Sequence, residues 1–147
     1  MKKKRKKTIK MKWIILIKKK KNLVDKYNKQ QITYQENIQN DVNSKIQQEQ
    51  DNINKDIANH KEKVDSFNNM VKDQNNGTEI DVEKMKQLYS EIESLTKTLQ
   101  EKKVETPKKI EDIKKKAKEE LNIKLEEFKQ KFNEENENLQ KKNGRIK

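Results

Sequence analysis

Hydrophobic residues recur at steps of three and four along most of the chain, which is the spacing of one face of a helix. Residues 22–72 contain neither Gly nor Pro, so this stretch predicts a single long helix. Gln31 and Gln50 occupy two polar positions of its seam. The other seam positions are Val24, Tyr27, Tyr34, Ile38, Val42, Ile46, Ile53, Ile57, His60, Val64, Phe67 and Val71. A jump of four residues to Val42 predicts a stutter, which locally unwinds a left-handed coiled coil.

A break in the helix is predicted at residues 73–78, which read Asp-Gln-Asn-Asn-Gly-Thr. Asn and Gly accept left-handed backbone angles, so they suit the C-terminal end of a helix. Thr78 is then placed to cap the next helix, with Asp81 in the acid-favoured first turn.

Two further helices are expected over residues 79–105 and 107–143. Pro107 separates them and predicts a bend, because proline lacks an amide hydrogen and suits the first turn of a helix. The seam positions are Met85, Leu88, Ile92, Leu95, Leu99, Ile110, Ile113, Leu121, Leu125, Phe128, Phe132 and Leu139. Met85 to Leu99 is the most regular heptad stretch, so burial is expected to be greatest around Ile92.

The composition argues against a compact globule and favours extended helices. Of the 147 residues, 29% are hydrophobic and 42% charged, and there are only two Gly and one Pro to form turns. We therefore predict an all-α, elongated coiled coil, broken near residues 73–78 and bent near Pro107. An antiparallel hairpin and an extended rod paired with another chain remain equal alternatives, because heptads do not encode whether the partner helix is in cis or in trans.

Charge divides the chain into a basic head, residues 1–21, and a formally neutral remainder. The head carries twelve basic residues and no acid, and the other 25 basic residues balance all 25 acidic ones. The main head positions are Lys2, Lys3, Lys4, Arg5, Lys6, Lys7, Lys18, Lys19, Lys20 and Lys21. The apolar run Trp13–Ile17 is far shorter than the roughly 20 residues of a membrane span or the roughly 7–15 of a signal-peptide core. A disordered tail is the alternative to a functional head.

No catalytic, cofactor-binding or metal-ligating constellation is found. One His and no Cys leave no Cys–His pair and no histidine cluster, and the two isolated glycines form no phosphate-binding loop. We therefore expect a non-enzymatic protein without a cofactor. His60 is interpreted as a residue that sets seam register, with a pH-sensitive interface as the alternative. The aromatic residues follow the apolar stripe, which favours packing over stacking on nucleic-acid bases.

These features predict a structural or scaffolding coiled-coil subunit of a larger assembly, with the cytoskeleton or the axoneme favoured. Its partners would be other helical proteins along the seam, and the head would attach to an acidic surface such as tubulin tails. The alternative is a membrane-surface tether held by the head on anionic lipid, and the third hypothesis is a nucleic-acid-associated coiled coil. An intracellular location is expected, with cytoplasm or cytoskeleton favoured and the nucleus as the alternative.

Overall fold

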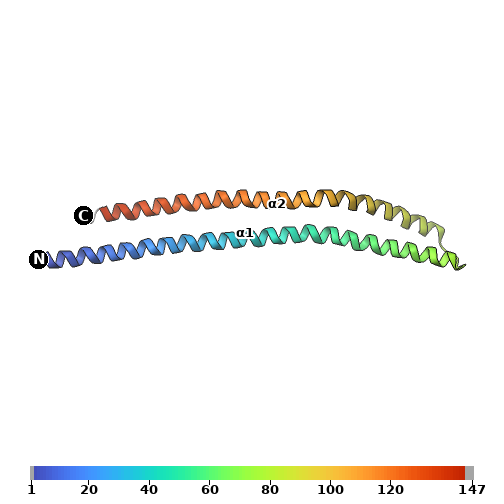
Figure 1. Ribbon diagram of the computed structural model, residues 1–147, viewed down its shortest axis with the longest axis horizontal. Coiled ribbons are helices and arrows are strands. Elements are labelled where there is room, and N and C mark those ends of the chain that lie inside the picture. Colours follow the sequence, from blue (N-terminus) through green and yellow to red (C-terminus); the bar gives the residue numbers. More distant parts are fainter. Residues whose placement is uncertain (1, 145–147) are drawn as a thin grey trace. The chain divides into compact units, whose positions relative to one another are not determined.

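The computed structural model describes the backbone of residues 2–144 and the side chains of residues 9–141. The described chain consists of two α-helices, α1 (Lys2–Asn75) and α2 (Val82–Gly144), joined by a short turn (Figure 1). The helices pack antiparallel. The all-α prediction is confirmed, and of the two topologies left open by the sequence the structure has the antiparallel hairpin.

Helix α1 ends in a glycine cap within the predicted break. Gly77 has a φ of 82°, in the left-handed region that favours glycine. The amide of Gly77 donates to the carbonyl of Gln74 at 3.1 Å, and the amide of Thr78 donates to the carbonyl of Asp73 at 2.9 Å. These two bonds form a Schellman motif, which satisfies carbonyls that the helix end leaves without partners.

Helix α2 begins later than expected and has a different cap. The amide of Lys84 donates to Asp81 Oδ1 at 3.2 Å, and the amide of Met85 donates to the Asp81 carbonyl at 3.0 Å. Asp81 is therefore the N-cap, and the assignment of this role to Thr78 was wrong. The physical reason is that the amide of Thr78 closes the cap of α1, so the chain needs residues 78–81 to turn before a new helix starts.

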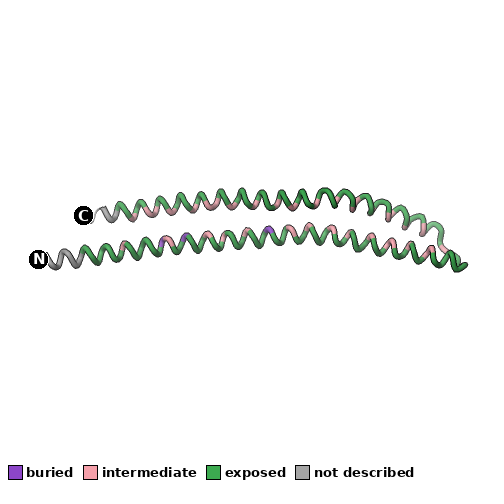
Figure 2. Tube along the Cα trace, viewed as in Figure 1, coloured by how far each residue is buried: buried purple, intermediate pink, exposed green. Residues whose placement is uncertain are grey.

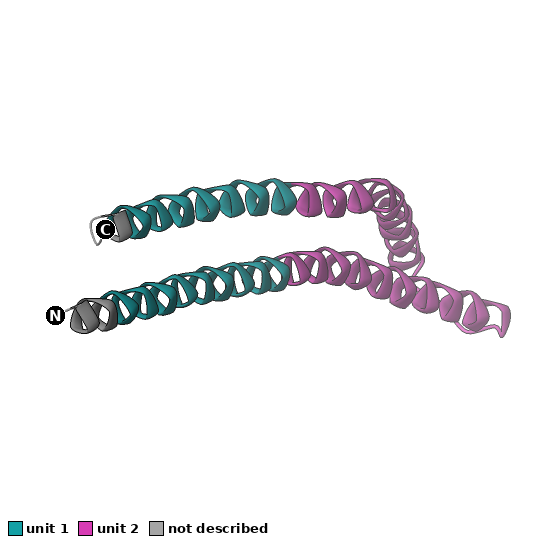
Figure 3. Cartoon of the chain, turned by 60° about the vertical axis from the view of Figure 1, so that its left-hand side comes forward, with its two compact units in different colours: residues 1–41, 116–147 teal, residues 42–115 magenta. Residues whose placement is uncertain are grey.

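The chain divides into two compact units (Figure 3). Unit 1 comprises residues 1–41 and 116–147, and unit 2 comprises residues 42–115. Unit 1 pairs the first part of α1 with the last part of α2. Unit 2 contains the rest of both helices and the turn that joins them.

Pro107 lies inside α2, so residues 79–105 and 107–143 are not separate helices. A proline removes one helical hydrogen bond and crowds the carbonyl four residues earlier, which kinks a helix without ending it when both flanks favour helix. Figure 3 shows α2 changing direction in its unit 2 segment, where Pro107 lies. The head is helical as well, because the backbone of residues 2–21 forms the start of α1.

Burial is slight throughout the described residues (Figure 2). Only Leu23, Tyr27 and Val42 are buried, and no polar or charged side chain is. The accessible surface is 12329 Å², whereas a compact monomer of this mass, 17.7 kDa, would expose about 8000 Å². The helices thus pair along one edge and leave most of their surface open.

The expected maximum of burial around Ile92 was wrong, because Ile92 is only partly buried. Among the described residues the least exposed side chain is Tyr27, at 5% exposure. Its large ring reaches across to two phenylalanine rings of α2, so it is covered more fully than the aliphatic side chains around Ile92.

Candidate functional site

The seam of unit 2 follows a seven-residue repeat on both helices. In α1 the partly or fully buried positions on this repeat are Val42, Ile46, Glu49, Ile53, Asp56, His60, Lys63, Phe67 and Met70, and Val64 and Val71 beside them are partly buried as well. In α2 they include Met85, Leu88, Ile92, Leu95, Leu99, Lys102 and Thr106. Both series step by alternating threes and fours, which is the heptad pattern of a left-handed coiled coil.

The seam of unit 1 follows an eleven-residue repeat instead. In α1 its positions include Leu16, Leu23, Tyr27, Gln31, Tyr34 and Ile38. In α2 they include Ala117, Leu121, Lys124, Phe128, Phe132, Glu135 and Leu139. Pairs such as Tyr27 and Ile38, or Phe128 and Leu139, stand eleven residues apart. An eleven-residue repeat has 3.67 residues per turn and favours a straight or right-handed pair.

The predicted seam residues lie on the inner edges of the helices, with one correction. All of the apolar ones are partly or fully buried except Ile57, which is 45% exposed, and Gln50 is exposed as well. The heptad passes through Glu49 and Asp56 instead. The sequence suggested Ile57 because it is apolar, and Gln50 because it fills the gap between Ile46 and Ile53. The register set by Val42 instead turns their neighbours Glu49 and Asp56 inward. Contact of these residues with a partner protein stays a prediction.

Sequence reasoning missed Leu23 and Leu16 in unit 1. Leu23 is 8% exposed and is one of the three buried residues, and Leu16 is partly buried. Both continue the seam backwards from Tyr27, Leu23 by four residues and Leu16 by eleven. That spacing was readable in the sequence, but the four lysines at 18–21 interrupt the apolar stripe between Leu16 and Leu23.

Four aromatic rings form the centre of unit 1. Tyr27 lies edge-on to Phe132, with ring centroids 5.8 Å apart, and to Phe128, with centroids 6.5 Å apart. Tyr34 also meets Phe128 edge-on at 6.1 Å, and Lys124 Nζ lies 5.6 Å from the centre of the Phe128 ring. Edge-on geometry brings a ring's positive rim to its neighbour's negative face, so these contacts add to simple burial. The rings pack against one another across the helices.

The hydroxyl of Tyr27 is anchored as well as its ring. It donates a hydrogen bond of 2.9 Å to Glu135 Oε1, and Lys26 Nζ lies 3.9 Å from the same oxygen. Burial, followed by this bond to an anionic acceptor, raises the pKa of Tyr27 above its usual value. The phenol therefore stays a neutral donor well into alkaline solution.

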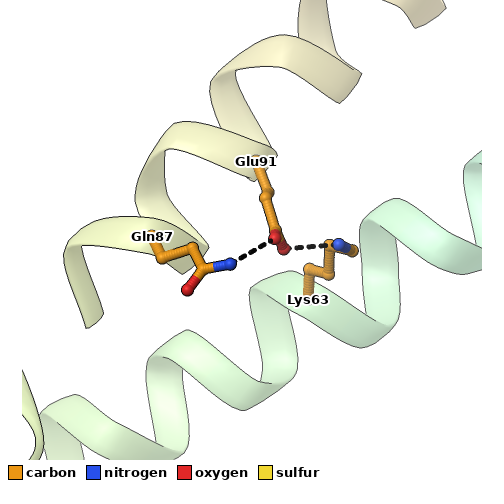
Figure 4. Close-up of polar contacts among 3 residues, drawn as sticks. All are labelled: Lys63, Gln87 and Glu91. Carbon is orange, nitrogen blue, oxygen red and sulfur yellow. Dashed lines mark hydrogen bonds and ion pairs between the residues drawn. The ribbon is translucent and has the colours of Figure 1, made fainter. Parts of the chain in front are cut away.

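Unit 2 has one tilted aromatic contact across its helices, between Phe67 and Tyr89 with ring centroids 6.0 Å apart, and adds ionic and polar bridges. Lys63 Nζ lies 2.5 Å from Glu91 Oε2, and Gln87 Nε2 donates to Glu91 Oε1 at 3.3 Å (Figure 4). Lys102 pairs with Asp56 and also donates to Asn52 Oδ1 at 3.1 Å. The hydrogen bond from Lys63 lowers the pKa of Glu91 below its usual value. Such partly exposed pairs add little stability, but they distinguish the correct register from shifted ones.

His60 also bridges the helices of unit 2, through Thr96. The Thr96 hydroxyl donates to the Ile92 carbonyl at 2.8 Å, which uses its only hydrogen. The 2.9 Å contact between His60 Nε2 and Thr96 Oγ1 is therefore a bond that His60 donates, so this nitrogen carries a hydrogen. This geometry agrees with a residue that sets the register of the two helices.

Two hollows flank the aromatic centre of unit 1. One, of about 590 Å³, is lined by residues that include Val24, Asn28, Asn122 and Leu125. The other, of about 550 Å³, is lined by Gln30, Thr33, Tyr34 and Phe128 among others. Helical periodicity puts the two sets on opposite flanks of the seam. Each hollow is an open trough along the line where the two helices meet.

Other kinds of site are not found in the described part of the chain. It contains no group of three or more His, Asp or Glu side chains arranged to hold a metal ion. None of its helices combines the length and the apolar character needed to cross a membrane. Comparison with protein-family models, curated proteins and solved structures gave no significant match. The features on which a function is based are therefore the seam, the two hollows and the head.

Proposed function

We propose that the chain is a non-enzymatic scaffolding subunit of a larger assembly, in which helices of other proteins pack along its seam. The observation that supports this proposal is incomplete burial. The hairpin covers its seam on one edge only, so that three side chains are buried among those described and two hollows flank the centre of unit 1.

Partner helices would complete the burial that two helices leave unfinished. Fully burying a Leu or Phe side chain contributes about 1.5–3 kcal/mol relative to leaving it exposed. Leu125 and Phe132 are only partly buried and line the larger hollow. A third or fourth helix laid in the hollows would remove the remaining apolar area from water, as neighbouring helices do in bundles.

The repeats of the two units restrict which helices fit. A helix packed along unit 1 needs apolar residues on an eleven-residue repeat to stay in contact, whereas one along unit 2 needs a heptad. The seam of unit 2 is partly polar, at Glu49, Asp56 and Lys63, so a helix packed there must place polar rather than apolar side chains next to these positions. Such constraints favour dedicated partners over general helix binding.

The cytoskeleton or the axoneme is the proposed location. A formally neutral body suits lateral packing, and a cationic head is attracted to acidic protein surfaces such as tubulin tails. Retention of the chain in the detergent-insoluble cytoskeletal fraction of its source cells, and its release on raising salt, would support this location. A chain found only in the soluble fraction would contradict it.

The experiment that tests the scaffolding function blocks the larger hollow without altering the seam. Asn28 and Asn122 are exposed residues on its rim, so Asn28→Lys with Asn122→Lys places two charges where a partner helix would lie. The control is Asn40→Lys with Gln130→Lys, which makes the same charge change at exposed positions away from the rims of both hollows. Each tagged chain is expressed in the source cells and sized by gel filtration with light scattering.

The wild type and the control are expected in particles larger than the single chain. The hollow variant is expected to lose partner affinity by at least about ten-fold, because burying unpaired charge at a helix interface is costly. Circular dichroism of the purified variant should show wild-type helicity. A wild-type chain that elutes alone, or a hollow variant that assembles as well as the control, would contradict the proposal.

A further inference from the structure

The head carries an apolar surface that the hairpin does not use. Leu16 faces the seam, and with Trp13 and Ile17 it lines a hollow of about 240 Å³ that also includes Leu139 of α2. Met11, Ile14 and Ile15 stand at positions i, i+3 and i+4 of the same helix, on the face turned away from the seam. They are 64%, 53% and 50% exposed.

This patch differs from other exposed apolar residues in the described chain. Elsewhere such residues occur singly, as with Ile32, Val104 and Ile123. Single exposed apolar side chains are normal in proteins, whereas contiguous ones mark a binding surface. In the head, six of the residues between positions 9 and 17 are large, apolar and at least 40% exposed.

Lysines flank the patch at both ends. Lys10 and Lys12 precede or interrupt it, and Lys18 to Lys21 follow it directly, all of them exposed. No acidic residue occurs before Asp25, so nothing along this segment neutralises them. The side chains of Lys2 to Lys7 lie outside the described residues, although the sequence adds their charge to the same end of the chain.

We propose that this surface, formed by Met11, Ile14 and Ile15 with lysines at both ends, binds the surface of an anionic lipid bilayer. A bilayer offers the two chemistries that the patch combines. Its anionic headgroups attract lysines, each worth roughly a five-fold change in affinity near the surface, and its hydrocarbon accepts the apolar side chains. Lysine stems extend from the apolar region to the headgroups.

Binding to nucleic acid or to an acidic protein would account for the lysines of this surface but not for its apolar residues. Phosphates or carboxylates would engage the lysines, but they gain nothing from exposed Met11, Ile14 and Ile15. The apolar run is also too short for the helix to cross the bilayer, which needs about 20 apolar residues. The bound head therefore lies in the interfacial region, independently of any helix that occupies the hollows of unit 1.

The test uses the full chain and two kinds of vesicle, phosphatidylcholine alone and phosphatidylcholine mixed with phosphatidylserine. Binding is followed by co-sedimentation. The wild type is expected to bind the mixed vesicles. Binding to phosphatidylcholine alone should be at least about ten-fold weaker, because these vesicles have no anionic headgroups to attract the lysines.

Two matched variants separate apolar insertion from charge attraction. Met11→Gln, Ile14→Gln and Ile15→Gln together should lower affinity for the mixed vesicles by at least about ten-fold. The control, Ile32→Gln, Val104→Gln and Ile123→Gln, makes the same kind of change at single exposed residues and should stay within about two-fold of the wild type. Circular dichroism verifies that all three chains remain helical.

Two results would overturn the proposal. One is equal binding of the head variant and the wild type, which would mean that the apolar patch is not used. Another is binding of the wild type to a DNA duplex or an acidic peptide but not to the mixed vesicles.

Discussion

Unit 1 and unit 2 are both antiparallel helix pairs, yet they are held together by different seams. Unit 1 has an eleven-residue repeat and edge-on aromatic contacts around Tyr27. Unit 2 has a seven-residue repeat with ionic and polar bridges such as Lys63 to Glu91. Because the period of a seam determines how two helices wind, the pairs are expected to wind in different senses. One helix can thus carry two modes of pairing in succession.

The units differ in charge as well. Unit 1 contains 23 basic and 10 acidic residues, a formal net charge of +13, whereas unit 2 contains 14 basic and 15 acidic residues, a net charge of −1. Most of the difference comes from the head. Electrostatic attachment is therefore a property expected of unit 1, and register selection through compensated ion pairs is expected of unit 2.

The largest effect is expected from two charges in the seam of unit 2. Ile92→Asp with Leu95→Asp should destabilise the hairpin by about 4 kcal/mol or more, because each partly buried apolar side chain is replaced by an unpaired carboxylate. Thermal unfolding followed by circular dichroism measures the loss, and incorporation into the native assembly should be abolished. Ser90→Asp with Ser94→Asp, at exposed positions of the same helix, is the matched control. Normal incorporation of the seam variant would refute the seam assignment.

Truncation of the central ring of unit 1 should have the next largest effect. Tyr27→Ala removes the contacts with Phe128 and Phe132 and should cost about 3 kcal/mol. Tyr27→Phe retains the ring and loses only the bond to Glu135, so it should cost about 1 kcal/mol. Hydrogen exchange should show the loss of protection within unit 1. Equal loss in unit 2 would mean that the units do not open separately.

A smaller effect is expected at the turn of unit 2. Gly77→Ala should cost about 1 kcal/mol, since the φ of 82° is unfavourable for alanine. Steric clash does not contribute, because an added Cβ would meet no atom within 4 Å. Gly77→Asn should recover part of the loss, as asparagine tolerates this conformation better. Denaturant unfolding measures all three chains, and a Gly77→Ala chain as stable as the wild type would argue against the glycine cap.

The smallest effect should come from Glu91. Its pKa is lower in the folded chain than in the unfolded one, so its contribution to stability is complete above the unfolded pKa and is lost as pH falls through the folded pKa. Glu91→Gln should therefore weaken the acid dependence of the melting temperature, and salt should do the same in the wild type. Glu93→Gln, exposed on the same helix, provides the control. An unchanged acid profile in Glu91→Gln would show that the ion pair is absent in solution.

Much of the fold was predictable because helices and turns depend on local spacing. Hydrophobic steps of three and four indicated the helices, and Asn75-Asn76-Gly77 indicated the end of α1. The N-cap of α2 was harder to predict, because the amide of Thr78 is already used in the glycine cap of α1. Continuity through Pro107 depends on the balance between one lost hydrogen bond and the helix-forming residues on both sides, which the residue type alone does not give.

The candidate site was predictable in outline only. Its apolar members were readable from their spacing, but Glu49 and Asp56 entered the seam because the register at Val42 carries them inward. The spacing of apolar residues cannot identify polar residues at seam positions. Whether the helices pair with each other or with another chain could not be predicted either, because the same repeat suits both topologies.

Hydrogen exchange of the chain alone and in the assembly from its source cells would test the central claim most directly. The claim is that the hairpin leaves part of its seam for helices of other proteins. In the assembly, amides of residues 24–35 and 122–132, which border the larger hollow, are expected to gain protection relative to the purified chain. Identical protection of these segments in both states would contradict the account, because no helix would then occupy the seam.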